Sequence, residues 1–496
     1  MSKGLVAAVA FSMLLACTAH GRALDDYVNE VDPTFNYTYG NVTVEGNGWT
    51  AYMYLMYSLK WLRPEDTDAH IWWHQMAIII PHGVNKSLDS ALLYITGETN
   101  DRNQWDFPDL KDEGLKLAGA LCYETKSPGA VVWQIPNQPI RFADDPYHSN
   151  RDGDAILGLT WWRYVHNTTD PTWIALFPMV KASVRALDVL NAVVPIHAPG
   201  MVNPNKFFVA GASKRGWTTW LVGAVDPRVI AIIPIVLCAV NVHAFAHRQW
   251  QFYGAWTFAL EPMWQMNFTQ DLDEPNTKKL FYEMDPWYYM DNLTMPKLAI
   301  NAVGDEFQMP DDQRYWAHDM PGEMNLLMVQ NAEHSMATGV LEVVQATSAF
   351  ILAIQNGYAR PNYTWSIDEA TGNITVSTPV TPTKVKVWSG LSALGISEGK
   401  RDFRWAAINA TPCPVSVFGA CLRPIIWDES EPAVIGTNTF MASFAPPEGR
   451  WLGFFIEVQW ANPYGKDFIF TSPVSVVPNT MAFPDCHGRQ CRGGLC

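Results

Sequence analysis

A short apolar run that turns through a serine into a helical pattern is the feature that most constrains this chain. Residues 207–210 are apolar and β-prone, Gly211 and Ala212 follow, and after Ser213 the helical pattern covers residues 214–222. A serine at such a turn projects its hydroxyl above the end of a sheet, where N–H groups at a helix start face the bound molecule. The small residues suit the crowding of the turn. The stretch therefore predicts a nucleophile elbow.

Strand-like runs alternate with helical patterns through residues 24–356. Apolar runs typical of strands buried on both faces occur at residues 76–81, 91–96, 130–135, 229–238 and 296–303. Helical spacing marks residues 152–166 and 180–193, between two of these runs. Such alternation indicates a parallel sheet covered by helices on both faces. We also expect residues 24–60 to form strands that lead into this sheet.

Two further parts of the chain differ from this pattern. Residues 241–291 are rich in Trp, Tyr, Phe, Met and His, which favours a cap inserted over the sheet, although a wide helical connection is the alternative. Beyond residue 356, short alternating segments separated by Gly, Pro and Asn indicate a β-sandwich over residues 362–482, followed by a Cys-rich tail at 483–496. The predicted class is α/β, with a mostly parallel sheet, a cap and a C-terminal β-sandwich.

The N-terminus predicts secretion. Residues 1–21 combine Lys3, an apolar run at residues 5–16 and small residues before Gly21, a pattern typical of a signal peptide; lipidation at Cys17 is the alternative. The apolar run is too short to span a bilayer comfortably, and we expect no later membrane span. Asn-x-Ser/Thr sites, which predict glycosylation of a secreted protein, occur at Asn36, Asn41, Asn85, Asn167, Asn267, Asn292, Asn362, Asn373 and Asn409.

Cysteine usage agrees with an oxidising compartment. Cys413 and Cys421 are close enough to close a loop, and Cys486, Cys491 and Cys496 predict another bridge in the tail. The odd number of cysteines after the signal leaves at least one unpaired or joined to another chain. The pairing stays open, and zinc binding by the tail is an alternative.

The net charge of −15, without a basic block, argues against nucleic acid as a partner. The histidines His74, His82, His243 and His247 match no usual metal-ligand spacing, so we expect them to be structural or to line a pocket. We therefore predict neither a metal nor a cofactor.

Ser213, Asp305 and His334 follow apolar strands in the order of an α/β-hydrolase triad. His334 would accept the Ser213 proton and return it to the leaving group, and Asp305 would orient the imidazole. Glu306 is the alternative acid because it is adjacent to Asp305. For the oxyanion we nominate the N–H of Lys214 and one N–H from Gly97, Glu98 or Thr99.

The elbow departs from the usual Gly-x-Ser-x-Gly because the second glycine is displaced to Gly216. Arg215 stands at the position where a small residue normally allows helix and strand to approach. The adjacent charges of Lys214 and Arg215 would assist the oxyanion or hold a substrate carboxylate; alternatively they form ion pairs with Asp154 or Asp226.

Several blocks together resemble the PhoPQ-activated pathogenicity-related family, which includes amoebal autocrine proliferation repressors. The blocks are residues 136–139, 211–220, 224–229, 304–307, 331–334, 401–404 and 453–457. The resemblance implies an α/β-hydrolase-like domain and a C-terminal β domain, without a settled substrate. The elbow is also similar to that of glucuronoyl esterases, whose basic residue after the serine assists the oxyanion.

Two functions follow as hypotheses. The first is a secreted serine hydrolase that forms an acyl-enzyme on Ser213 and acts on an ester or peptide-like bond of a small-molecule or peptide substrate. The second is a secreted signalling protein on a hydrolase scaffold, with a cell-surface receptor as partner and catalysis incidental or absent. Carbohydrate binding through the β-sandwich is a third reading that rests on fold analogy.

Overall fold

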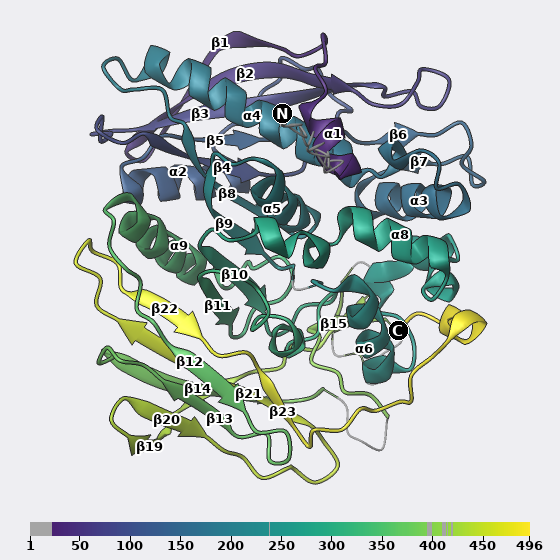
Figure 1. Ribbon diagram of the computed structural model, residues 1–496, viewed down its shortest axis with the longest axis vertical. Helices are drawn as coiled ribbons and strands as arrows, with labels where there is room; N and C mark the ends of the chain where they lie inside the picture. The colour runs from purple at the N-terminus through teal and green to yellow at the C-terminus, as the bar shows by residue number, and fades with distance from the viewer. Residues whose placement is uncertain (1–21, 238, 394–398, 409–412, 414, 418–419) are drawn as a thin grey trace, which may run out of the picture.

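The computed structural model describes residues 22–237, 239–393, 399–408, 413, 415–417 and 420–496 (Figure 1). Within this part of the chain, a nine-stranded sheet has the order β1-β2-β3-β5-β4-β8-β9-β10-β11. Its strands are β1 (Asn36–Gly46), β2 (Trp49–Lys60), β3 (Ile71–Pro81), β4 (Ser90–Ile95), β5 (Gly129–Val132), β8 (Lys206–Ala212), β9 (Val229–Ile235), β10 (Lys297–Ala302) and β11 (Met324–Val329). The pairs from β5 to β11 are parallel, whereas β1, β2 and β3 pair antiparallel.

Helices cover both faces of this sheet, as the alternating pattern predicts. On one face lie α1 (Ala23–Asn29), α4 (Leu176–His197) and α5 (Lys214–Val225). On the other face lie α2 (Glu113–Thr125) and α9 (Val340–Gln355). The strand order, with its one reversal at β5-β4 and parallel strands beyond it, makes the fold α/β-hydrolase-like.

The segment between β9 and β10 is helical, and its residues 241–292 are called the cap segment below. It contains α6 (Val242–Tyr253), η2 (Phe258–Leu260), α7 (Glu261–Gln265), η3 (Phe268–Asp271), α8 (Pro275–Met284) and η4 (Pro286–Asn292). It packs against α3 (Gly153–His166). The short 3-10 turn η1 (Pro171–Trp173) lies between α3 and α4 in the chain. The short strands β6 (Ile140–Arg141) and β7 (Asn150–Arg151) lie just before α3.

Two sheets of short strands form the additional β domain at the C-terminal end of the chain (Figure 1). One contains β12 (Thr364–Ile367), β13 (Ile374–Ser377), β20 (Thr439–Ala442) and β19 (Ala433–Gly436). The other contains β18 (Asp428–Ser430), β14 (Lys384–Leu391), β21 (Leu452–Trp460), β22 (Phe468–Thr471) and β23 (Ser475–Val477). Their inner side chains share a core with α9 and β11, so this domain is packed against the main sheet.

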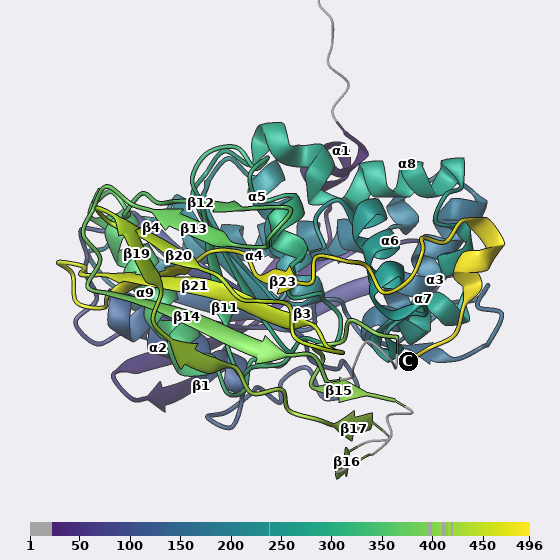
Figure 2. The same cartoon turned by 90° about the horizontal axis from the view of Figure 1, so that it is seen from below.

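A smaller sheet and the tail complete the fold (Figure 2). The small sheet contains β15 (Ala406–Ala407), β17 (Ala420–Leu422) and β16 (Val415–Val417). The tail carries η7 (Gly488–Arg492) and returns to the cap segment, where Leu495 pairs with Trp256. Cys413–Cys421 and Cys486–Cys491 form disulfides, in agreement with the cysteine spacing. Among the described residues, Cys122 and Cys496 are free and buried.

The prediction of strands over residues 24–60 is wrong at its start, because residues 23–29 form α1. Leu24, Tyr27 and Val28 have helical spacing and are buried where α1 packs against α4. A helix of seven residues is too short for this spacing to distinguish it from a strand in the sequence. The predicted signal peptide at residues 1–21 lies outside the described residues. Among the helices that are described, none combines the length and apolar character that a membrane crossing needs.

Most predicted glycosylation sites are at the surface. The exposed asparagines are Asn36, Asn41, Asn85, Asn167, Asn267, Asn292 and Asn362. Asn373 is half-buried, and Asn409 lies outside the described residues. A glycan needs an accessible asparagine, so the fold leaves these sites open to modification.

Candidate active site

Ser213 lies at a sharp turn between β8 and α5. Its backbone has φ 60° and ψ −128°, a conformation that residues with a side chain rarely adopt. A side chain at position 211 would meet the Arg215 carbonyl oxygen at 2.7 Å, and one at 216 would meet the Ile235 carbonyl oxygen at 2.8 Å. Gly216 therefore provides the close approach of helix and strand, one residue later than the usual motif places it.

Ser213, His334 and Asp305 form a continuous hydrogen-bonded chain. The Ser213 Oγ lies 2.9 Å from His334 Nε2, and His334 Nδ1 lies 2.8 Å from Asp305 Oδ2. Each residue follows a parallel strand, β8, β11 and β10 respectively, so the sheet brings their loops to the same edge. The structure thus brings together the three side chains that the sequence order selects.

Asp305, rather than Glu306, faces the imidazole. The second oxygen of Asp305 accepts the backbone N–H groups of Phe307 and Gln308, which holds the carboxylate in place. Glu306 instead accepts the backbone N–H of His334 through Oε2 at 3.2 Å. Burial, followed by the nearby Asp305 charge, raises the pKa of Glu306 to about 7. Glu306 therefore supports the loop that carries His334 and does not contact its ring nitrogens.

The surroundings of His334 favour its protonated form. Burial lowers the pKa of the imidazole, but attraction to the Asp305 carboxylate and their hydrogen bond outweigh this, so the net pKa is raised. The Phe307 ring lies against the imidazole, with 4.3 Å between centroids. These contacts fix the ring with Nε2 directed at the Ser213 hydroxyl.

The nominated oxyanion donors are on the segments that follow β4 and β8, which are neighbouring strands of the sheet. Lys214 is the first residue of α5, so its N–H has no partner within the helix. The N–H of Thr99 donates to the Glu98 side chain, which leaves those of Gly97 and Glu98 as candidates on the loop after β4. Arg215 packs over Gly97, where a Cβ would lie 2.0 Å from its guanidinium.

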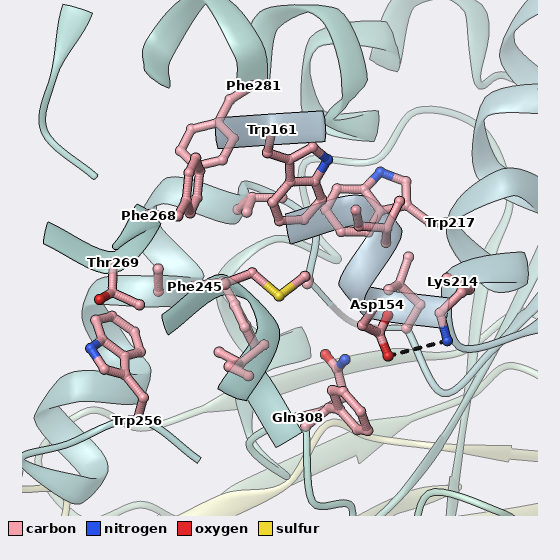
Figure 3. A pocket seen from close by; sticks show the side chains of 18 of the residues that line it. Asp154, Trp161, Lys214, Trp217, Phe245, Trp256, Phe268, Thr269, Phe281 and Gln308 are labelled. Atoms are coloured by element: carbon pink, nitrogen blue, oxygen red, sulfur yellow. Dashed lines mark ion pairs between the residues drawn. The ribbon is translucent and has the colours of Figure 1, made fainter. Parts of the chain in front are cut away.

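The two basic side chains after Ser213 are already engaged. Lys214 Nζ lies 3.2 Å from Asp154 Oδ2, and this pair is mostly buried (Figure 3). Arg215 Nε donates to the carbonyl of Ile135. Asp226, the other partner considered from sequence, pairs with Arg228. Burial lowers the pKa of Lys214, and Asp154 opposes that shift, so the pair compensates its own charge next to the hydroxyl.

An apolar pocket opens beside Ser213 between α3, α5 and the cap segment. Its walls carry large aromatic side chains, namely Trp161, Trp217, Phe245, Trp256, Phe268 and Phe281 (Figure 3). Apart from the tryptophans, its polar lining residues are Asp154, Ser213, Lys214, Thr269 and Gln308. The pocket therefore offers apolar surface on one side of the hydroxyl, with few polar groups to orient a ligand.

The C-terminal β domain holds the loops of Asp305 and His334, a role that the sequence did not indicate. Asn331 exchanges two hydrogen bonds with the backbone of Trp427, at 3.1 and 2.8 Å. The N–H of Trp405 donates to the Gly304 carbonyl, and a side chain at 304 would meet the Trp405 ring at 2.4 Å. Asn331 and Gly304 each lie within three residues of the His334–Asp305 pair, so the β domain positions both.

Comparison with known proteins agrees with the family resemblance of the sequence blocks described above. A family model described as PhoPQ-activated pathogenicity-related protein matches residues 24–404. The chain belongs to this family. A curated relative, autocrine proliferation repressor protein A from Dictyostelium discoideum, is 34% identical over 489 residues, which cover 95% of this chain and 94% of the relative.

Solved structures that are similar to this family member include esterases and peptidases. Acetyl xylan esterase 1 from Thermoanaerobacterium sp. JW/SL YS485 has a TM-score of 0.43 and 12% identity, covering 66% of this chain and 93% of the esterase. Glucuronoyl esterase from Solibacter usitatus has a TM-score of 0.36 and 15% identity, covering 59% of this chain and 73% of the esterase.

Proposed function

We propose that this chain is a secreted serine hydrolase that cleaves an ester or peptide-like acyl bond next to an apolar group. The observation that carries the proposal is the chain of contacts from Ser213 through His334 to Asp305 at the wall of an apolar pocket. A serine needs an adjacent base to become a nucleophile, and the base needs a group that orients it. Both partners are present at hydrogen-bonding distance.

In the first half-reaction, Ser213 Oγ attacks the carbonyl carbon while its proton passes to His334 Nε2. Asp305 stabilises the imidazolium that forms, without taking the proton itself. The carbonyl oxygen becomes an oxyanion, which the N–H of Lys214 and one from Gly97 or Glu98 would stabilise. A donor of this kind lowers the barrier by about 2.7–4 kcal/mol. His334 then donates its proton to the departing alcohol or amine, and the acyl group stays on Ser213.

In the second half-reaction, water attacks the acyl-enzyme carbonyl and gives its proton to His334. The bond to Ser213 Oγ breaks, the proton returns to that oxygen, and a carboxylic acid leaves. The same two nitrogens of His334 therefore serve both halves, in agreement with their contacts to Ser213 and Asp305.

The pocket favours an apolar group on one side of the scissile bond. Its aromatic walls remove apolar surface from water, which stabilises binding by about 25 cal/mol per Å². The Lys214 ammonium does not act as an open anion site, because Asp154 neutralises it at 3.2 Å. We therefore expect carboxylate-bearing and polyanionic compounds to be poorer substrates than neutral apolar esters.

A panel of nitrophenyl esters with acetyl, butanoyl, hexanoyl and octanoyl groups, paired with acetate esters of alcohols of matched length, tests this function. We expect kcat/KM to rise with chain length in one of the two series and the Ser213→Ala variant to be inactive. A fluorophosphonate probe should label the wild type and not Ser213→Ala. Folded, secreted protein that neither reacts with the probe nor hydrolyses any ester would contradict the proposal.

Secretion and glycosylation are part of the same proposal. Residues 1–21, the two disulfides and the exposed Asn-x-Ser/Thr sites support it. Expression in a eukaryotic host should release a chain without residues 1–21, whose mass falls after treatment with an N-glycosidase. Retention of residues 1–21 in the released protein would contradict it.

As a second function we propose repression of proliferation, which the name of the relative supports, with a cell-surface receptor as the partner. That relative is named an autocrine proliferation repressor and covers almost the whole chain. Wild-type and Ser213→Ala protein should be added separately to growing Dictyostelium discoideum cells. Equal repression by both would show a signal independent of catalysis, whereas repression by the wild type alone would join the two functions.

A further inference from the structure

Two histidines of α6 converge on one carboxylate outside the hydrogen-bonded chain of Ser213, His334 and Asp305. His243 and His247 are one helical turn apart and share a face of α6, with 4.6 Å between ring centroids. The Nε2 atom of each lies 3.2 Å from Oδ1 of Asp273, which follows η3. Three potential donor atoms thus lie within 4.8 Å of one another.

The C-terminal tail completes the surroundings of these donors. Asp485 Oδ1 lies 2.8 Å from Nδ1 of His247, which leaves Nε2 of that ring directed at Asp273. A carboxylate on the outer nitrogen is how metal-bound histidines are usually oriented. His487 Nδ1 lies 3.4 Å from the other oxygen of Asp273, and the His487 side chain is exposed.

We propose that His243, His247 and Asp273 bind a zinc ion, with His487 as the fourth ligand. Imidazole nitrogen and carboxylate oxygen are zinc donors. The sequence analysis expected His243 and His247 to be structural or to line a pocket, but α6 places them four residues apart on one helix face, which is a known zinc-binding arrangement. A tetrahedral ion with bonds of about 2.0–2.1 Å separates its ligand atoms by roughly 3.3 Å. The observed 3.2 Å between each Nε2 and Asp273 Oδ1 matches that separation. Calcium and magnesium, which prefer oxygen donors, fit this set poorly.

The ion would join three segments that are distant in sequence: α6, the loop after η3 and the tail. The same helix lines the apolar pocket through Val242, Phe245 and Ala246, which alternate with the two histidines along α6. Binding at one face of α6 would therefore hold the pocket wall on another. We assign the ion a structural role, because Ser213, His334 and Asp305 form a complete hydrogen-bonded chain without it.

The test uses the full-length secreted protein, stripped with EDTA, dialysed and titrated with ZnCl₂. We expect one zinc per chain by mass spectrometry of the metal content, and a rise of several degrees in the thermal midpoint. The His243→Ala/His247→Ala variant should lose the bound ion and the thermal shift. Asp485→Asn should weaken zinc binding by about 10–100-fold, because His247 loses its orienting carboxylate.

The matched control is His82→Ala, because His82 is an exposed histidine outside the cluster. It should bind zinc and shift its thermal midpoint as the wild type does. If the double variant does not fold, His487→Ala replaces it, since that side chain is exposed and its loss should weaken binding by at least tenfold. Substoichiometric zinc in the wild type, or equal binding by the wild type and the cluster variants, would overturn the proposal.

Discussion

His334 and the α6 histidines both contact carboxylates, but they use that contact in opposite ways. His334 stands between two different partners, with the fully buried Asp305 side chain on Nδ1 and the Ser213 hydroxyl on Nε2. His243 and His247 instead direct equivalent nitrogens at one oxygen of Asp273, whose side chain is 34% exposed. A ring between a carboxylate and a hydroxyl can transfer a proton, as the proposed hydrolase requires, whereas several donor atoms near one point can hold a cation, as the proposed zinc site requires.

We expect the largest change in activity from substitution of Asp305, which contacts Nδ1 of His334. Asp305→Asn should lower kcat about 10⁴-fold on the preferred ester, because the imidazole loses both its orientation and the stabilisation of its cation. Glu306→Gln should stay within about tenfold of the wild type, since an amide oxygen can still accept the backbone N–H of His334. Steady-state kinetics of both variants decide between the two acids. A larger loss in Glu306→Gln than in Asp305→Asn would reverse our assignment.

The pH dependence provides the second test, because the free base must be neutral to accept a proton. The pKa of His334 is raised above its ordinary value of 6.5, so kcat/KM should fall as the pH drops through a midpoint above 6.5. Burial raises the pKa of Glu306 to about 7, so Glu306→Gln must be measured in parallel.

The pH profiles of two variants show which residue causes the loss of activity at low pH, called the acidic limb here. Persistence of the acidic limb in Glu306→Gln would assign the limb to His334. In Asp305→Asn the limb should move to lower pH, because the charge that raises the imidazole pKa is gone. A limb that disappears in Glu306→Gln would contradict the assignment to His334.

The pocket wall on α6 connects the two regions and gives a smaller effect. Ala246 is buried and lines the pocket, so Ala246→Phe should fill space that a long apolar group would occupy. We expect kcat/KM for the longest good ester to fall about 10–100-fold, with the acetyl ester within a few-fold. The acetyl ester and fluorophosphonate labelling are the internal controls for folding. An equal loss on all chain lengths would show that this wall does not select the substrate.

The sequence predicts one of the two regions far better than the other. Ser213, Asp305 and His334 each follow a strand, and parallel strands bring such loops to one edge, so chain order selects the three loops. The sequence left Glu306 open as the acid, and the contact between Asp305 and His334 distinguishes the two. Asp273 follows a short 3-10 turn and His487 lies in the tail, where no strand register fixes their neighbours. Only tertiary contacts, such as the pairing of Leu495 with Trp256, bring the tail to α6.

For the same reason, the sequence does not indicate which residues support the loops of Asp305 and His334. Trp427 and Trp405 belong to the β domain, and nothing in their local pattern indicates contact with Asn331 or Gly304. The sequence shows that the second glycine of the motif is displaced to Gly216, but not how this displacement directs the Arg215 side chain. The structure shows that Arg215 turns to the Ile135 carbonyl while Gly216 makes the close contact with β9. A side chain's direction at such a turn depends on neighbours that sequence spacing does not specify.

The smallest expected effect tests whether the two histidine regions communicate. Removal of zinc with EDTA should lower kcat/KM for the longest ester by about threefold, because α6 carries both the histidines and the residues Phe245 and Ala246. The acetyl ester should be unaffected, since the contacts of His334 with Ser213 and Asp305 do not involve α6. Added ZnCl₂ should restore the long ester in the wild type but not in His243→Ala/His247→Ala. Equal losses on both esters, or restoration in that variant, would mean that the ion acts elsewhere and that α6 does not transmit its binding to the pocket.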